Sequence, residues 1–306
     1  MTPARFGFVL CGSIFNCSTV SGLRAILLVF LSGPLATAQF VPALLQNASY
    51  WGDGKSEIDF YDADTVRDGQ HFHNELLLIL TPGFVDPVTF APLQTRRPTE
   101  CAPIIRMKQG VTVPRGLVLE QRSLESFWFM EPLRLGQLSF VGTDGIGNIS
   151  RIVRPKPAAT PPAWLLNEES YQGLSQYPPI LSPAGDFVFY DELPLRVRTI
   201  DFSKDKGDFD IQMAGTVEKP SATFGFKPAK ITFQRGERQI EVELKHERGS
   251  DHFVLDANFP FLLREWKMAN GESWKMKNSI RADYLKYNKA GDREKALKDP
   301  MLRHPD

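Results

Sequence analysis

The best candidate metal ligands in this sequence are His71 and His73. Residues two apart on a strand point the same way, so both imidazoles could reach one ion. The spacing specifies no third ligand, and the available donors lie elsewhere in the chain: Asp59, Asp62 and His252. The two histidines can equally well belong to a polar segment that leads into the apolar run beginning at Leu76. A metal-dependent hydrolase using His71 and His73 is therefore our second hypothesis.

Five carboxylates lie close together between residues 53 and 64: Asp53, Glu57, Asp59, Asp62 and Asp64. Paired carboxylates serve glycoside hydrolysis and calcium binding. However, Glu57, Asp59 and Tyr61 alternate with Ile58 and Phe60, a pattern typical of a strand with one solvated face. We expect these acids to lie on the surface rather than to form a catalytic pair.

Sequence motifs of other catalytic classes are missing. The chain has no Gly-x-Ser-x-Gly nucleophile motif, no phosphate-binding loop and no His-Glu-x-x-His helix, and the glycine-rich segment 142–147 lacks the spacing of a dinucleotide site. Cys101 is the last of three cysteines and argues only for a free thiol, since Cys11 and Cys17 lie in the expected leader. We expect no cofactor and no catalytic residue.

Tryptophans are the remaining side chains that could recognise a ligand. Most of the five will belong to the core, because large aromatic residues dominate β cores. A sheet that curls into an open barrel can also hold an apolar molecule on its concave face. We expect Trp128, Trp266 and Trp274 to line such a site. The predicted partner is a lipid-like small molecule or an envelope protein, and a purely structural envelope role is a third possibility.

Residues 1–38 have the pattern of a signal peptide. A short apolar run at 23–35 follows a positive charge, and Ala36-Thr37-Ala38 places small residues at the cleavage positions before Gln39. The run is shorter than the roughly 20 apolar residues that a membrane-spanning helix needs. We therefore predict a periplasmic or secreted bacterial protein without a transmembrane span after signal removal.

The composition favours a folded domain with a neutral surface. Lysine and arginine number 36, aspartate and glutamate also 36, and 42% of the residues are hydrophobic. A balanced charge does not draw a protein to nucleic acid, and this hydrophobic content can supply a core. The mature chain is expected to be mainly β, with antiparallel meander sheets that form a curled sandwich or open barrel and few helices.

Alternating apolar residues place the expected strands. The early ones are 56–61, 75–80, 115–122, 126–130, 187–190 and 195–202, and the later ones include 209–213, 231–233, 240–244 and 253–257. Segment 75–80 lacks alternation, which predicts a central strand covered on both faces. The proline-rich segment 142–185 is expected to hold little regular structure and to join two halves, 39–141 and 186–285, of one β domain, 39–285. Residues 286–306 form a polar tail in which Asp292 can cap a short helix to Lys298, although its composition favours fraying.

The turn at residues 269–271 decides which side chains share a face. A two-residue Asn-Gly turn would pair Trp266 with Lys275. A three-residue loop with Gly271 in the left-handed conformation instead pairs Trp266 with Trp274 and places Arg264 opposite Met276. Because it buries both tryptophans on one face, we predict the three-residue loop.

Two segments resemble parts of uncharacterised exported bacterial β proteins. Residues 50–61 are similar to an aromatic-x-Asp-Gly-Lys-Ala-Glu opening. Residues 253–284 resemble the closing hairpins of the domain-of-unknown-function 3108 class through Leu262-Leu263-Arg264-Glu265-Trp266, Gly271 and Trp274. Some proteins of that group are labelled septum formation inhibitor Maf, but the phosphate-binding opening of the Maf nucleotide pyrophosphatases does not occur here. The resemblance implies an exported β protein and transfers no site residue.

Overall fold

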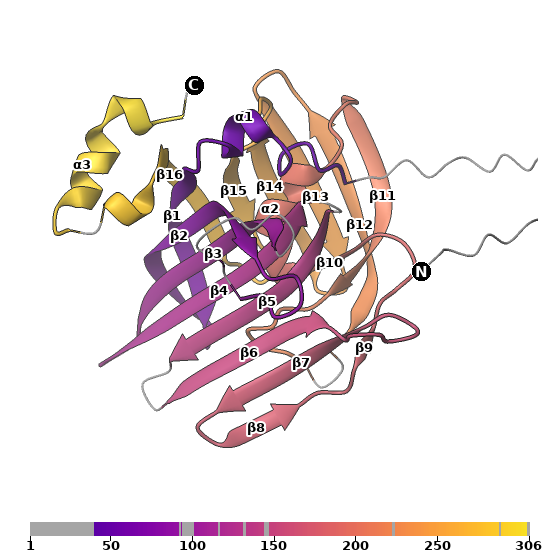
Figure 1. Ribbon diagram of the computed structural model, residues 1–306. Coiled ribbons are helices and arrows are strands. Elements are labelled where there is room, and N and C mark those ends of the chain that lie inside the picture. Colours follow the sequence, from indigo (N-terminus) through magenta and orange to yellow (C-terminus); the bar gives the residue numbers. More distant parts are fainter. Residues whose placement is uncertain are drawn as a thin grey trace, which may run out of the picture. The chain divides into compact units, whose positions relative to one another are not determined.

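Strands of alternating burial make up most of the described chain. The computed structural model describes residues 40–91, 93, 101–115, 117–130, 133–143, 147–221, 224–287 and 289–304. These residues belong to the compact unit Ala38–Asp306 (Figure 1). The predicted signal peptide, 1–38, lies outside the described residues.

A single sheet contains all 16 strands in the order β10-β11-β12-β13-β14-β15-β16-β1-β2-β3-β4-β5-β6-β7-β8, with β9 paired to β7. Neighbours are antiparallel except β10 and β11, which are parallel. The first and last strands, β1 and β16, pair in the middle of the sheet. The strands are β1 (Ser56–Arg67), β2 (Gln70–Val85), β3 (Ala102–Arg115), β4 (Val118–Met130), β5 (Leu133–Thr143), β6 (Asn148–Pro155), β7 (Ala163–Ser170), β8 (Gly173–Gln176), β9 (Ile180–Leu181), β10 (Phe187–Phe189), β11 (Lys206–Ala214), β12 (Phe226–Arg235), β13 (Gln239–His246), β14 (Gly249–Asp256), β15 (Leu263–Lys267) and β16 (Ser273–Ala282).

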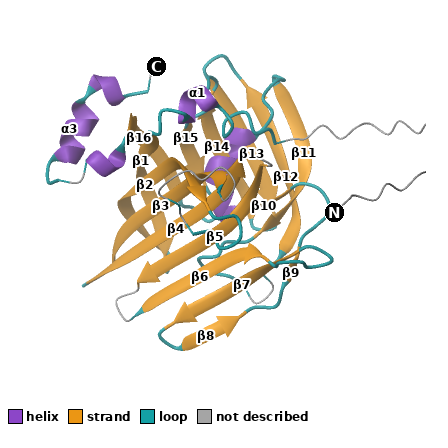
Figure 2. Ribbon diagram, viewed as in Figure 1, coloured by secondary structure: helices purple, strands orange, loops and turns teal. Residues whose placement is uncertain are grey.

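The helices of the described residues are short (Figure 2). The α-helices are α1 (Ala48–Trp51), α2 (Leu193–Arg196) and α3 (Asp292–Lys298), and single 3₁₀ turns occur at Tyr190–Glu192, Val197–Thr199, Tyr284–Lys286 and Pro300–Leu302. Within the described ranges, no helix has the length and apolar character needed to cross a bilayer. The expectation of a mainly antiparallel β fold with few helices is confirmed.

The sheet curls around its own apolar face, so that both halves contribute to one main core. Helix α2 lies inside the curl, and its residues Leu193 and Leu195 are fully buried there (Figure 1). Trp164 on β7 contacts Phe187 and Phe189 on β10, with ring centroids 6.0 and 5.0 Å apart. The two ends of the sheet thus approach through aromatic side chains, while the strand order ends at β10 and β8 without closing.

The outer face of the sheet carries smaller apolar clusters. Leu76, Leu78 and Leu80 on β2 enter the main core, whereas Leu77 and Ile79 pack on the other side near α3. The prediction of a central strand covered on both faces is therefore confirmed. Helix α3 covers one side of this region, and Gly291 rather than Asp292 is its N-cap.

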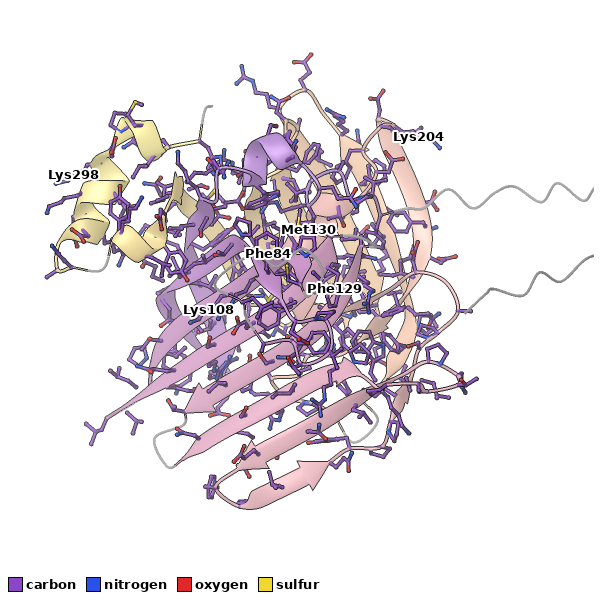
Figure 3. The ribbon with its side chains drawn as sticks, viewed as in Figure 1. Phe84, Lys108, Phe129, Met130, Lys204 and Lys298 are labelled. Atoms are coloured by element: carbon purple, nitrogen blue, oxygen red, sulfur yellow. The ribbon has the colours of Figure 1, made fainter. Side chains whose placement is uncertain are left out.

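The end of β4 shows the same two-sided packing. Phe129 packs in an outer cluster with Val85, Ile104 and Phe127, whereas its neighbour Met130 packs against the main core (Figure 3). Successive side chains of a strand point to opposite faces, so the two neighbours serve different clusters.

The prediction of little regular structure at 142–185 is wrong, because this segment holds the end of β5 and strands β6 to β9. The prolines lie at positions where strand pairing does not need a backbone N–H donor. Pro155 is the last residue of β6, Pro161 and Pro162 precede β7, and Pro183 follows β9. Proline is compatible with strand ends and turns, so its density here marks turns between short strands.

Two predicted strands are also wrong. Segment 195–202 is helical, through α2 and the 3₁₀ turn Val197–Thr199, and Pro194 occupies the first turn of α2 as proline favours. Because this segment is buried on all sides within the curl, its apolar run resembles a buried strand. Segment 115–122 contains the β3–β4 turn, since β3 ends at Arg115 and β4 begins at Val118.

The β15–β16 hairpin has the predicted three-residue loop. Trp266 pairs with Trp274, and Met268 N donates to Glu272 O at 2.9 Å across the loop. Gly271 has φ 88°, the left-handed conformation that the bulge requires. Arg264 Nη1 lies 3.2 Å from Met276 Sδ, as expected for side chains opposite each other.

The acidic face of β1 was predicted to be solvated, and this is wrong. Glu57, Asp59 and Tyr61 are fully buried at 0% exposure. The alternation is present, but the acids face the interior, and the C-terminal residues around Ala296 cover the opposite face at Ile58 and Phe60. Alternation specifies that two faces differ, and it does not specify which one the rest of the chain covers.

A buried ion pair explains why Glu57 can face inward. Arg198 Nη1 and Nη2 donate to Glu57 Oε1 and Oε2 at 2.6 and 3.0 Å, and both side chains are 0% exposed. The guanidinium also donates to Pro260 O at 2.9 Å, and Tyr50 Oη donates to Glu57 Oε2 at 2.5 Å. Burial alone would raise the pKa of Glu57, but the attraction of Arg198 and these hydrogen bonds bring it below its ordinary value.

Asp59 lies beside this pair, and its pKa shifts in the opposite direction. Ser279 Oγ donates to Asp59 Oδ1 at 2.5 Å, and Oδ2 has no hydrogen-bond partner among the described residues. Burial, with repulsion from Glu57, raises the pKa of Asp59 well above its ordinary value. The buried environment thus favours the protonated form of Asp59, whereas Arg198 favours the ionised form of Glu57.

The Glu57–Arg198 pair predicts a strong stability effect. Arg198→Met keeps much of the side-chain volume but leaves the Glu57 carboxylate buried without its cation. We expect denaturant unfolding to show a loss of about 3–5 kcal/mol. The matched control, Lys277→Met, breaks the exposed Lys277–Asp62 pair and should change stability by no more than about 0.5 kcal/mol. A loss below about 1 kcal/mol for Arg198→Met would contradict this role of the pair.

Candidate ligand-binding site

His71 and His73 do not meet a third metal ligand in the structure. Both are exposed near the start of β2, and His71 Nδ1 lies 3.1 Å from Asp64 Oδ2. Asp62 pairs with Lys277, and the buried Asp59 binds Ser279. No three histidine, cysteine or acidic side chains in the described ranges gather as a metal site would require.

A cavity of about 370 Å³ lies between the β1–β5 half of the sheet and the hairpins of β13–β16. Its apolar lining combines aromatic and aliphatic side chains from both halves: Leu76, Val111, Leu124, Phe140, Trp266, Met268 and Trp274. Its polar lining includes Arg67, Gln109, Arg122, Asp191, Glu218, His246, Arg248 and Glu272. Cavities of this size, lined by aromatic and aliphatic side chains beside polar groups, are typical of small-molecule sites.

Two of the three predicted ligand-binding tryptophans line this cavity, and the third does not. Trp266 and Trp274 lie with ring centroids 4.8 Å apart in an edge-to-face arrangement. Trp128 is 1% exposed and is not part of the lining. It packs instead near the guanidinium of Arg196, whose Cζ lies 5.2 Å from its ring and 3.9 Å from that of Phe40.

Asp251 orients much of the cavity wall. This fully buried carboxylate accepts hydrogen bonds from Tyr190 Oη at 2.8 Å, Trp266 Nε1 at 3.0 Å and Ala269 N at 2.9 Å. His246 Nε2 lies 3.1 Å from Asp251 Oδ1. Burial opposes ionisation, but these hydrogen bonds lower the pKa of Asp251. Asp251 thus holds four lining residues in place as a buried anion.

His246 is oriented for structure rather than for proton transfer. Its Nδ1 accepts a hydrogen bond from Arg248 N at 3.2 Å, so Nε2 carries the proton and donates to Asp251. Both ring nitrogens are engaged within the protein wall. The Asp251–His246 pair therefore has no free nitrogen to act as a general base toward a molecule in the cavity.

Two arginines and a shared carboxylate form a charged cluster in the cavity lining. Glu218 Oε1 lies 3.0 Å from Arg67 Nη2 and 2.6 Å from Arg122 Nη1. Arg67 also pairs with Glu272 at 2.7 Å, and Arg122 with Glu120 at 2.5 Å. The two arginine side chains are only 10% and 6% exposed, which makes these interactions stronger than surface pairs.

Asp191 fixes the segment that carries Glu218. Thr216 Oγ1 donates to Asp191 Oδ1 and Val217 N donates to Oδ2, each at 2.6 Å. Burial raises the pKa of Asp191 to about 7, although both hydrogen bonds favour the ionised form. Burial also raises the pKa of Glu218, against the attraction of Arg67.

Sequence reasoning missed the polar residues of this site. Arg122 shares a strand face with the buried Leu124, and Asp251 shares one with Phe253 and Leu255. A charged residue in phase with apolar ones is a signal for a polar group that faces the interior. The contact of Glu218 with β1 and β4 spans 151 and 96 residues of sequence, so no local pattern specifies it.

Comparison with known proteins shows little sequence similarity. No family model matches the chain, and no curated protein matches it. Among solved structures, the chain is similar to a beta-barrel-like protein of domain of unknown function DUF1849 from Brucella abortus, with 8% identity and a TM-score of 0.40, over 75% of this chain and 98% of that one. The resemblance to the domain-of-unknown-function 3108 class remains a prediction.

The raised pKa of Asp191 predicts a pH-dependent contribution to stability. The carboxyl holds a proton up to about pH 7 when folded, whereas an unfolded aspartate releases it near pH 4. The folded state binds more protons between these values, so this contribution is greatest at low pH and is lost as the pH rises through about 7. Wild type should therefore lose stability relative to Asp191→Asn between pH 5 and pH 8, by about 1 kcal/mol or more.

Denaturant unfolding at both pH values measures this difference. Asp210→Asn, at an exposed position on β11, is the matched control and should differ from wild type by the same amount at both pH values. A difference between wild type and Asp191→Asn that is constant, or that changes in favour of wild type as the pH rises, would rule out the proposed titration.

Proposed function

We propose that this protein is an exported, non-catalytic β protein that binds an apolar, lipid-like molecule in the cavity between β1–β5 and β13–β16. The observation that carries the proposal is the cavity of about 370 Å³, with Trp266 and Trp274 in its wall. Aromatic walls give an apolar ligand a large contact area, and the packed strands around them keep the site formed without it.

The polar groups of the cavity support binding rather than catalysis. The imidazole of His246 is engaged at both nitrogens, and Asp251 is enclosed by donors of the protein itself. Such groups hold the wall in one conformation. A preformed wall reduces the ordering cost of binding, so the same groups that orient the tryptophans also favour affinity.

Export is part of the proposal on sequence grounds. The apolar run 23–35 and the small residues Ala36-Thr37-Ala38 support a cleaved leader. A protein that carries a lipid-like molecule through the envelope would shield the apolar surface of that molecule from water. A cavity with Trp266 and Trp274 in its wall is suited to that role.

Titration with the neutral fluorescent dye N-phenyl-1-naphthylamine tests the proposed function. The mature protein should bind it saturably, with a change in tryptophan emission from Trp266 and Trp274. Val111→Trp, which fills the cavity from β3, should weaken binding about tenfold or more, since the volume that the dye would occupy is lost.

Val141→Trp provides the matched control, because Val141 is on the outer face of β5 and is 48% exposed. It should bind the dye like wild type. Thermal melts of both variants establish that they are folded. Absence of saturable binding to wild type, or equal binding by a folded Val111→Trp, would overturn the proposal.

A further inference from the structure

The Glu218 carboxylate lies in the cavity at a position where the acid group of a bound molecule could also contact two arginines. The carboxylate lies between Arg67 from β1 and Arg122 from β4, and all three residues line the cavity. Both arginines point inward from strands of the sheet, whereas Glu218 comes from the connection after β11. The cationic pair belongs to the rigid wall, and the anion belongs to a loop that reaches into it.

Each arginine keeps a carboxylate of its own when Glu218 is disregarded. Arg67 pairs with Glu272 and Arg122 with Glu120. Glu218 is thus a further acceptor shared by the two cations. Arg67 Nε is buried and lacks a hydrogen-bond partner, so within the described part of the chain this guanidinium donor is not used.

The segment that carries Glu218 is held by its backbone, independently of the carboxylate. Asp191 binds Thr216 Oγ1 and Val217 N, and Arg151 donates to the backbone carbonyls of Val217 and Glu218. The Glu218 side chain is 26% exposed, which leaves it room to rotate toward solvent. Its carboxylate can leave the arginines while the segment remains in place.

We infer that the Glu218 carboxylate occupies the position of the ligand's own acid group, and that the cavity takes a single-chain carboxylic acid. The inference rests on the proposed function and names its ligand class. The ligand carboxylate would replace Glu218 between Arg67 and Arg122, with the apolar chain along Trp266 and Trp274. Arginine binds carboxylates with paired N–H donors, so a carboxylate suits this position. The cavity volume of about 370 Å³ suits one chain.

The test compares dodecanoate with dodecanol, each below its aggregation limit, by displacement of N-phenyl-1-naphthylamine. The two probes share the chain and differ in the acid group. Glu218→Gln removes the competing charge at nearly constant size, and it should raise the affinity for dodecanoate about tenfold or more, in line with one charged hydrogen bond. The affinity for dodecanol should stay within about twofold, since an alcohol gains little from the freed arginines.

Glu265→Gln is the matched control. Glu265 lies on β15 beside Trp266 in sequence, but it pairs with Lys267 at 3.0 Å and does not line the cavity. It removes the same charge nearby and should leave the affinities for both probes unchanged. If Glu265→Gln raised the affinity for dodecanoate equally, the effect would come from a general change in the protein's electrostatic field, and the inference would be overturned.

A second variant tests the cation directly. Wild type should bind dodecanoate more tightly than dodecanol. The Arg67→Met variant should bind dodecanoate no more tightly than dodecanol, provided that circular dichroism shows a folded protein. If Glu218→Gln binds both probes with no gain for the acid, the inference fails while the proposed function stands. If neither the dye nor dodecanol binds to wild type, the proposed function itself fails.

Discussion

Glu57 and Arg198 form a fully buried ion pair on which the arrangement of the interior depends. Glu57 belongs to β1 in the centre of the sheet, and Arg198 belongs to the helical segment that fills the curl. Tyr50 adds the N-terminal segment, and Pro260 O adds the loop between β14 and β15. A charge placed in an apolar interior is tolerated only with such partners. One pair therefore fixes how β1 and the segment just before it meet two distant parts of the chain, the helical segment and the β14–β15 loop.

That anchoring determines where the interior is filled and where it is hollow. Near Glu57, helix α2 and the residues after it occupy the concave face and pack against both halves of the sheet. Toward the other end of β1, at Thr65 and Arg67, a cavity remains between the same two halves. The same strand thus carries an ion pair that organises the core at one end and a cationic wall of the cavity at the other. Arg198 is surrounded by its partners, whereas Arg67 Nε is buried without a hydrogen-bond partner among the described residues.

The wall of the cavity also contains buried acidic side chains that the protein itself supplies with hydrogen-bond donors. Asp251 receives four hydrogen bonds from residues that surround the hollow, and Asp191 receives two from the segment that carries Glu218. Each is an acid at a position where strand alternation or packing would favour an apolar residue. Buried polar groups with their partners present hold side chains in one arrangement, which a binding site needs more than a plain core does.

The sequence by itself determined the β class, the central position of β2 and the loop that pairs Trp266 with Trp274, because each depends on local period or turn chemistry. It did not determine which face of β1 is buried, that residues 195–202 are helical, or that strands occupy 148–181. These features depend on packing against segments that are far away in the sequence. The sequence predicted Trp128, Trp266 and Trp274 alike as ligand-binding residues, and the tertiary structure places only Trp266 and Trp274 in the cavity lining. Only the tertiary structure brought Glu218 to Arg67 and Arg122, since charges far apart in sequence interact only after the sheet has curled.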